Sequence, residues 1–145
     1  MTGGLRSVML IDDNEADRYL LRRLLRKARV TDSVLEAPDG ASALELLANF
    51  EESAALHQSH WPPALLLVDL NMPRMTGLEF LTAFSGIRGD HGLDALDVIM
   101  MSSSERPEDR KPALVHEFVR GFIAKMPKSA EHLRTEIEAL GVSCE

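Results

Sequence analysis

Short, continuous runs of apolar residues recur along the chain and alternate with segments of helical periodicity. The runs occupy residues 8–11, 34–35, 64–68, 98–101 and 122–124. Within each run apolar and polar residues do not alternate, and an unbroken apolar run is typical of a strand that is buried on both faces of a parallel sheet. The pattern therefore predicts parallel strands, each followed by a helix.

The segments between these runs carry apolar residues at helical spacing, together with residues that begin or end helices. Asp39 and Ser129 suit helix N-caps. Thr76 precedes a third helix, and Gly141 ends the last one. In the first segment, the stripe expected to face the core consists of Leu20, Leu21, Leu24, Leu25 and Ala28.

Parallel strands in one sheet need crossover connections of one hand, so the helices must cover both faces of the sheet. The predicted fold is α/β: a doubly wound, five-stranded parallel sheet, (βα)5, in a flavodoxin-like three-layer sandwich. A chain of 145 residues forms one domain, with a core at about residues 5–140. We expect no output domain after Leu140.

Two segments are longer than the usual connection between a helix and a strand. They span residues 51–63 and 86–97. Both are interpreted as surface loops, and a contact to a partner through Trp61 is the alternative for the first of them.

The fourth predicted helix contains prolines. Pro107 suits a first helical turn, but Pro112 lacks the N–H group that a helix interior requires and would clash with the preceding turn. We therefore expect the regular helix to begin between residues 109 and 111, after a loop at 103–108.

The charge balance and the single cysteine exclude several kinds of protein. Lys and Arg number 16 against 23 Asp and Glu, a net charge of −7, whereas a nucleic-acid-binding surface needs clustered basic residues. No stretch approaches the roughly 20 apolar residues of a membrane span, and the N-terminus does not resemble a signal peptide. With Cys144 as the single cysteine, we expect a cytoplasmic protein whose exposed thiol has no function.

Charged and hydroxyl side chains follow the predicted strands at the points where the strands end. Asp12 and Asp13 follow the first strand and Asp69 the third. Ser102 follows the fourth and Lys125 the fifth. In open α/β sheets ligands bind beyond the carboxyl ends of the strands, so we expect these side chains to converge on one edge of the sheet.

Three carboxylates gathered at one edge repel one another unless a positive charge lies among them. Mg²⁺ prefers oxygen ligands and suits Asp13 and Asp69, with Asp12 one shell further out. The cation and Lys125 together could neutralise a phosphoryl group, to which Ser102 could donate a hydrogen bond. Since no cysteine, histidine or glycine-rich loop lies nearby, the candidate nucleophile is a carboxylate, and Asp69 is central in the sheet.

This ordered set resembles the receiver domain of two-component response regulators, and it is similar to the single-domain chemotaxis regulators over about residues 5–140. The resemblance implies that Asp69 accepts a phosphoryl group from a sensor histidine kinase. The motifs that carry it are the pair Asp12-Asp13, the segments 36–40 and 68–77, and the positions of Ser102 and Lys125.

The same resemblance implies a role for each residue of the site. Lys125 would bind a phosphoryl oxygen, Ser102 would move inward to donate a hydrogen bond to it, and Phe122 would be the aromatic switch residue that turns with Ser102. The protein would be a switch that assists its own phosphotransfer and dephosphorylation, and otherwise not an enzyme. The implied ligands of Mg²⁺ are Asp13, Asp69 and the backbone carbonyl of Asn71, with Asp12 acting through water.

Two positions differ from the pattern of this family. Where the family has Lys-Pro, this chain has Lys125-Met126-Pro127. A cis bond between Lys125 and Met126 would cost roughly 2.5–4 kcal/mol, so we predict a trans bond or a rearranged loop. Phe122 lacks the hydroxyl group of a switch tyrosine, so its inward and outward rotamers should differ less in hydrogen bonding.

Without an output domain, the signal must leave through contacts with other proteins. The implied surface is formed by the fourth helix, the fifth strand and the fifth helix. It would bind a downstream protein or a phosphotransfer protein, or form a homodimer. The residues around Asp12-Asp13 and the enlarged 51–63 segment resemble small regulators paired with phytochrome-type histidine kinases. Neither a nucleic acid nor a membrane is an expected partner.

Two other functions agree with parts of the sequence. A receiver-like protein-binding module that is never phosphorylated is favoured by the Lys125-Met126-Pro127 departure. A phosphohydrolase with an aspartyl nucleophile is disfavoured, since such enzymes typically carry a second Asp two residues after the nucleophile. This chain has Asn71 at that position and leaves no room for a cap domain.

Overall fold

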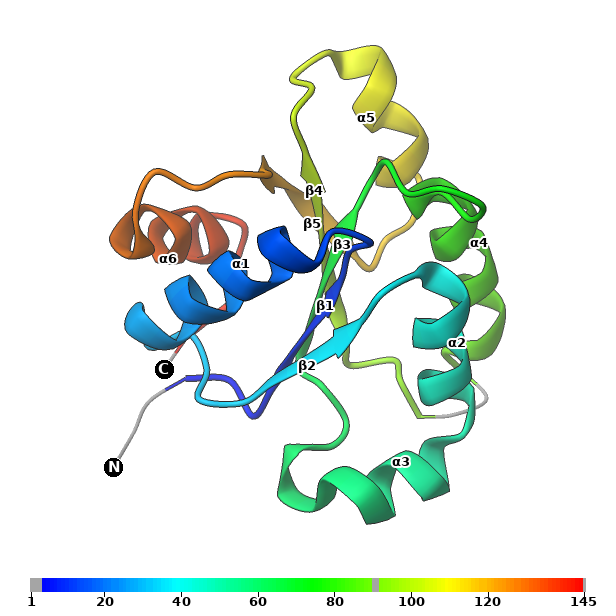
Figure 1. The fold of residues 1–145 in the computed structure, drawn as a ribbon. Coiled ribbons are helices and arrows are strands. Elements are labelled where there is room, and N and C mark those ends of the chain that lie inside the picture. Colours follow the sequence, from blue (N-terminus) through cyan, green and yellow to red (C-terminus); the bar gives the residue numbers. More distant parts are fainter. Residues whose placement is uncertain (1–3, 90–91, 145) are drawn as a thin grey trace.

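A computed structural model describes residues 4–89 and 92–144 of the chain. Its strands form one parallel, five-stranded sheet in the order β2-β1-β3-β4-β5, with β3 at the centre between β1 and β4 (Figure 1). This order confirms the predicted doubly wound fold. The strands are β1 (Val8–Ile11), β2 (Val34–Ala37), β3 (Leu65–Asp69), β4 (Asp97–Ser102) and β5 (Val119–Ala124).

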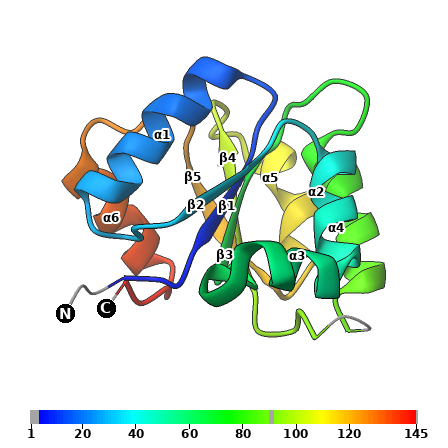
Figure 2. The ribbon, with the colours of Figure 1, turned by 60° about the horizontal axis from the view of Figure 1, so that its bottom comes forward.

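Helices cover both faces of the sheet, as the views of Figures 1 and 2 show. In the described ranges, no helix combines the length and the apolar character that crossing a membrane requires. One face carries α1 (Glu15–Lys27) and α6 (Ala130–Ala139), and the other carries α2 (Gly40–Ala48), α4 (Gly77–Ile87) and α5 (Pro107–Leu114), with α3 (Phe50–His57) below α2 in Figure 1.

The central strands are buried on both faces, which explains why their sequences read as unbroken apolar runs. In β1, Met9 packs in the core beneath α2, α4 and α5, whereas its neighbour Leu10 packs in the core beneath α1 and α6. In β3, Leu66 and Leu67 divide between the two cores in the same way. All four side chains are fully buried, so neither layer of helices can be removed without exposing the sheet.

The predicted helix caps are present, with one correction to the first helix. Oδ1 of Asp39 accepts a hydrogen bond from the backbone N–H of Ser42 (2.7 Å), which helps to hold the pKa of the Asp39 carboxyl below its ordinary value. Thr76 forms a capping box with Glu79 at the start of α4, and Ser129 caps α6. Leu20 is 42% exposed, however, so the buried stripe of α1 is narrower than predicted.

The prediction that the fourth helix starts at residues 109–111 is wrong. The helix α5 begins at Pro107, and Pro112 lies inside it. Pro107 is preorganised for a first helical position, and Pro112 faces solvent in a helix of about two turns, where it removes a single backbone hydrogen bond. Upstream of the helix, Oγ of Ser104 donates to Oδ2 of Asp109 (2.6 Å) and accepts from the N–H of Arg106 (3.2 Å).

The long segment at 51–63 is mostly helical, not a loop. It contains nearly all of α3 and a 3₁₀ turn, η1 (Gln58–His60). Trp61 is only 6% exposed and its ring stacks on that of His57, with centroids 5.6 Å apart. The indole therefore packs within the protein, and an exposed tryptophan available for a partner is not what the structure shows.

Residues at the C-terminal end and in the 86–97 segment are also more buried than expected. Cys144 is fully buried, so the predicted exposed thiol is wrong; burial raises the pKa of this thiol. Arg134 in α6 donates to the backbone oxygen of Cys144 (3.4 Å), which ties the C-terminal residues to the helix. In the 86–97 segment, Leu93 and Leu96 are buried in the core beneath α4.

Replacing Gly77 with alanine is expected to lower the free energy of unfolding by about 1–3 kcal/mol. A Cβ at Gly77 would lie 2.6 Å from the backbone oxygen of Asp69 and 2.8 Å from Cα of Leu70, and these atoms cannot move without displacing the end of β3. Urea denaturation measures the loss.

Gly86 provides a matched control in the same helix. Outside the helix itself, no described atom lies within 4 Å of a Cβ placed there, so Gly86→Ala should stabilise the protein by up to about 1 kcal/mol through helix propensity. Equal effects of the two substitutions would show that the approach of α4 to β3 is not tight.

Candidate functional site

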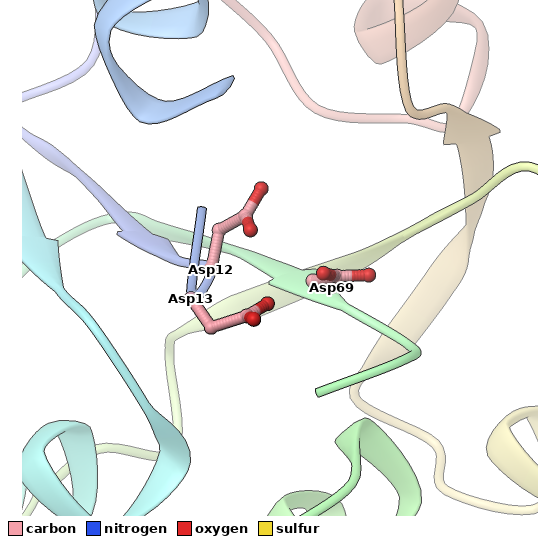
Figure 3. Close-up of side chains that lie close together, drawn as sticks. All are labelled: Asp12, Asp13 and Asp69. Atoms are coloured by element: carbon pink, nitrogen blue, oxygen red, sulfur yellow. The ribbon is translucent and has the colours of Figure 1, made fainter. Parts of the chain in front are cut away.

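Three aspartates meet at the carboxyl ends of the neighbouring strands β1 and β3 (Figure 3). In the parallel register Ile11 of β1 pairs with Val68 of β3, so Asp12 and Asp69 follow at the same level. One carboxylate oxygen from each of Asp12, Asp13 and Asp69 lies within 4.8 Å of the others. Asp12 and Asp69 are buried and Asp13 is exposed. The predicted gathering of these carboxylates is confirmed.

Lys125, which follows β5, supplies the positive charge of the site. Its Nζ donates to Oδ2 of Asp69 (2.6 Å) and lies 3.6 Å from Oδ1 of Asp12 and 3.5 Å from Oδ2 of Asp17. Burial by itself lowers the pKa of the ammonium, but the hydrogen bond to Asp69 and the three negative charges raise it above its ordinary value. Lys125 is therefore held in its charged form.

The bond between Lys125 and Met126 is trans, as predicted. Among the described residues the cis peptide bond is that between Trp61 and Pro62. The Lys125-Met126-Pro127 sequence thus still places the ammonium on Asp69.

Asp12 has the chemistry of a cation ligand. Its Oδ1 accepts from the N–H of Asn14 (2.9 Å), and its Oδ2 is buried with no hydrogen-bond partner among the described residues. Burial raises the pKa of this carboxyl, and the charges of Asp69 and Asp17 raise it further, against the opposing effects of Asn14 and Lys125. A buried oxygen without a donor, in a set made only of oxygens, fits a hard cation such as Mg²⁺.

The loop after β3 is fixed to Asp69 through its backbone. The N–H of Asn71 donates to Oδ1 of Asp69 (3.1 Å), and the N–H of Gly77 donates to the oxygen of Leu70 (2.9 Å). With Lys125 on Oδ2, both carboxylate oxygens of Asp69 have donors. The side chain is therefore oriented before any ligand arrives.

Ser102 and Phe122 lie on the side of the site toward α5. Ser102 ends β4, is 3% exposed, and its Oγ accepts from the N–H of Ser104 (3.0 Å). Phe122 in β5 is partly buried, and the guanidinium of Arg110 lies 5.0 Å from the centre of its ring. The same guanidinium donates from Nε and Nη2 to the backbone oxygen of Ser104 (3.2 and 3.1 Å).

An ion-pair network holds the connection between β1 and α1. Nη1 of Arg18 donates to the backbone oxygen of Asp12 (2.7 Å), and its Nε donates to Oε1 of Glu36 in β2 (3.1 Å). Arg22 donates to the other oxygen of Glu36. Glu36 therefore helps to position the backbone of Asp12 through Arg18. In the sequence, Glu36 is recognisable only as part of the 36–40 motif.

Asp17 and Arg110 are site residues that sequence reasoning missed. Asp17 is four positions after Asp13, a helical spacing that could have predicted its place beside the site. An acidic residue in the first turn is also explained by its favourable interaction with the helix dipole, so the spacing alone did not single it out. Arg110 lies in the helix whose start was predicted incorrectly. No simple spacing links Arg110 to Phe122 twelve positions later.

The strand ends of this doubly wound parallel sheet gather aspartates around a lysine, an arrangement that fits the receiver class of signalling domains. The chain belongs to the response regulator receiver domain family, whose model matches residues 8–138.

Proteins similar to this chain include regulators and a kinase. The chemotaxis protein CheY of Pseudomonas aeruginosa is 31% identical over 133 residues, 92% of this chain and 94% of CheY. The sensor histidine kinase CheAY of Helicobacter pylori is 31% identical over 131 residues, 90% of this chain but 14% of the kinase. The structure of the bacteriophytochrome response regulator RtBRR superimposes with a TM-score of 0.71 at 26% identity, covering 100% of this chain and 81% of that one.

In a buffer with EDTA, Asp12→Asn is expected to raise the melting temperature. The pKa of the buried carboxyl is raised, so its ionised form costs folding free energy at neutral pH, and that cost is relieved as the pH falls through the raised pKa. The amide avoids this cost and still accepts from Asn14. A gain of about 1 kcal/mol corresponds to a rise of a few degrees, measurable by calorimetry.

Asp13→Asn is the matched control for this substitution. Asp13 is exposed, so its carboxylate stays hydrated and the gain should be smaller. A lower melting temperature for Asp12→Asn would contradict an electrostatic cost at the site.

Proposed function

We propose that the protein is a stand-alone response regulator that accepts a phosphoryl group on Asp69 from a sensor histidine kinase. The observation that carries this proposal is the 2.6 Å contact of Lys125 with Asp69 inside the acidic cluster. The contact supports the proposal because it would bring a nucleophilic carboxylate and a cation for the transferred group to one point.

The transfer proceeds by attack of a carboxylate oxygen of Asp69 on the phosphorus of a phosphohistidine. The new P–O bond forms as the P–N bond breaks, and the electron pair of that bond remains on the imidazole nitrogen. The phosphoryl group brings about two negative charges, and Lys125 exchanges its contact with the carboxylate for one with a phosphoryl oxygen.

Asp12, Asp13, Asp69 and the backbone carbonyl of Asn71 would hold Mg²⁺ beside the phosphoryl group. When bound, the cation supplies further neutralisation of the phosphoryl oxygens. The buried Oδ2 of Asp12 supports this assignment, since it lacks a donor within the described structure.

Phosphorylation changes the conformation of the face formed by α5, β5 and α6. These elements correspond to the fourth helix, fifth strand and fifth helix predicted from the sequence. The Ser102 hydroxyl turns to donate to a phosphoryl oxygen. Because Oγ of Ser102 accepts from Ser104, and the oxygen of Ser104 accepts from Arg110, the movement reaches Phe122 through the guanidinium. This face would bind a downstream or phosphotransfer protein, or a second copy of the chain.

Similarity to particular proteins supports the stand-alone role and the kind of kinase. The chain covers 94% of CheY, a chemotaxis protein, and all of its length superimposes on RtBRR, a bacteriophytochrome response regulator. We infer a phytochrome-type histidine kinase as the partner to test first. Phosphotransfer from a panel of purified kinases would identify the partner by its rate.

Incubation with acetyl phosphate and Mg²⁺ is expected to add one phosphoryl group, detected by intact-protein mass spectrometry. The adduct should be absent from Asp69→Asn, since the amide is not a nucleophile for this transfer. Asp94→Asn, which changes an exposed aspartate away from the site, is the control and should behave like the wild type. If the wild-type protein gains no mass, the chain is instead a receiver-like binding module that is never phosphorylated.

Beryllofluoride, an analogue of the phosphoryl group, is expected to shift the backbone amide signals of residues 102–114 and 119–125 most strongly. Arg110→Met removes the guanidinium from Phe122, so the shifts in β5 should shrink while those of Ser102 remain. Arg106→Met is the control because Arg106 is exposed and pairs with Glu108. Undiminished β5 shifts in Arg110→Met would rule out coupling through Arg110.

A further inference from the structure

One of the carboxylates around Lys125 does not belong to the acidic cluster. Asp17 lies in α1, and its Oδ2 is 3.5 Å from Nζ of Lys125. The group that could hold a cation among the described residues consists of Asp12, Asp13 and Asp69. Asp17 therefore acts on the lysine from outside the cation site.

The position of Asp17 is set by the start of α1. Asn14 is the N-cap, and its Oδ1 accepts from the N–H of Asp17 (2.9 Å), which fixes Asp17 in the first helical turn. The side chains of Asp17 and Lys125 are each 22% exposed. A pair that is largely shielded from water retains more of its Coulomb energy than a surface pair.

Phosphorylation changes what the other two carboxylates can offer Lys125, but it leaves Asp17 unchanged. Asp69 would become an acyl phosphate and lose its own negative charge, and Asp12 would be among the residues that hold the cation. The lysine would then pair with a phosphoryl oxygen, while Asp17, whose Oδ2 lies 3.5 Å from Nζ, competes for the same ammonium.

We propose that Asp17 is a positioning residue that draws the Lys125 ammonium away from the phosphoryl group and so restrains phosphorylation. The inference rests on the proposed function of Asp69. Its negative charge also repels a dianionic group arriving beside the lysine, so competition and repulsion act in the same direction. The consequence is a site that captures free phosphoryl donors less readily than its lysine and aspartates would otherwise allow.

The test is the affinity for beryllofluoride in the presence of Mg²⁺, measured by titration at low ionic strength. Asp17→Asn is expected to bind about three- to fivefold more tightly than the wild type, the range for a partly exposed ion pair. Asp17→Glu keeps a negative charge in the same turn and should return the affinity toward the wild-type value. The gain should diminish as salt screens the charges.

Glu15→Gln is the matched control. Glu15 is the other acidic residue in the first turn of α1, so this substitution loses the same charge and the same interaction with the helix dipole. It is expected to leave the affinity within about twofold of the wild type. The rate of phosphorylation by acetyl phosphate should follow the same order among the variants, and thermal unfolding confirms that each is folded.

Equal affinities of the wild type and Asp17→Asn would overturn the inference, as would an equal gain in Glu15→Gln. Weaker binding by Asp17→Asn would also overturn it, because Asp17 would then hold the lysine in its productive place. These results differ from failure of the proposed function, in which the wild-type protein binds no beryllofluoride and gains no phosphoryl group at Asp69.

Discussion

The carboxylates of Asp12, Asp13 and Asp69 repel one another, and the fold holds them close together against this repulsion. Two of the three are buried, where an uncompensated charge is costly. The ammonium of Lys125 offsets part of that cost by direct contact with Asp69 across 56 positions of sequence. The end of β5 is therefore tied electrostatically to the centre of the sheet, and a change in the charge of Asp69 would act directly on Lys125.

The scaffold around this cluster combines backbone constraints with the ion-pair network of Arg18, Arg22 and Glu36. The parallel register of β1 and β3 sets Asp12 and Asp69 at one level. Arg18 holds the backbone oxygen of Asp12, and the close approach of Gly77 to the end of β3 holds the backbone at Asp69. Gathering like charges costs folding free energy, which the burial of the two apolar cores on either side of the sheet must offset.

The sequence was sufficient for features that depend on local pattern. Buried strands appear as unbroken apolar runs, and caps such as Asp39 and Ser129 have a chemical signature of their own. The convergence of Asp12, Asp69 and Lys125 could be predicted because the carboxyl ends of parallel strands share one edge. The roles of these side chains in phosphotransfer are supported by the family and stay predictions for this chain.

Features that depend on contacts between distant segments could not be predicted. The helix α3 has no strong apolar stripe, and its neighbour Trp61 is buried by tertiary packing. Cys144 is buried because the C-terminal residues return to α6, where Arg134 also bonds to the oxygen of Ala28 at the end of α1. Pro112 is tolerated because it faces solvent. The sequence of a short polar segment does not reveal which of its helical positions will face solvent.

Phe122 has no hydroxyl group, but a tertiary contact with Arg110 holds its ring. A switch residue without a hydroxyl cannot signal its rotamer through a hydrogen bond, but its ring can still be held by a cation. Arg110 makes both contacts: its guanidinium lies over the ring of Phe122 and donates two hydrogen bonds to the backbone oxygen of Ser104. Inward movement of Ser102 would pull on Ser104 through the bond between them, and the arginine would then have to slip from the ring or carry it along. If the site signals to the face of α5, β5 and α6 as proposed, the signal would depend on the guanidinium of Arg110 rather than on the chemistry of the aromatic residue.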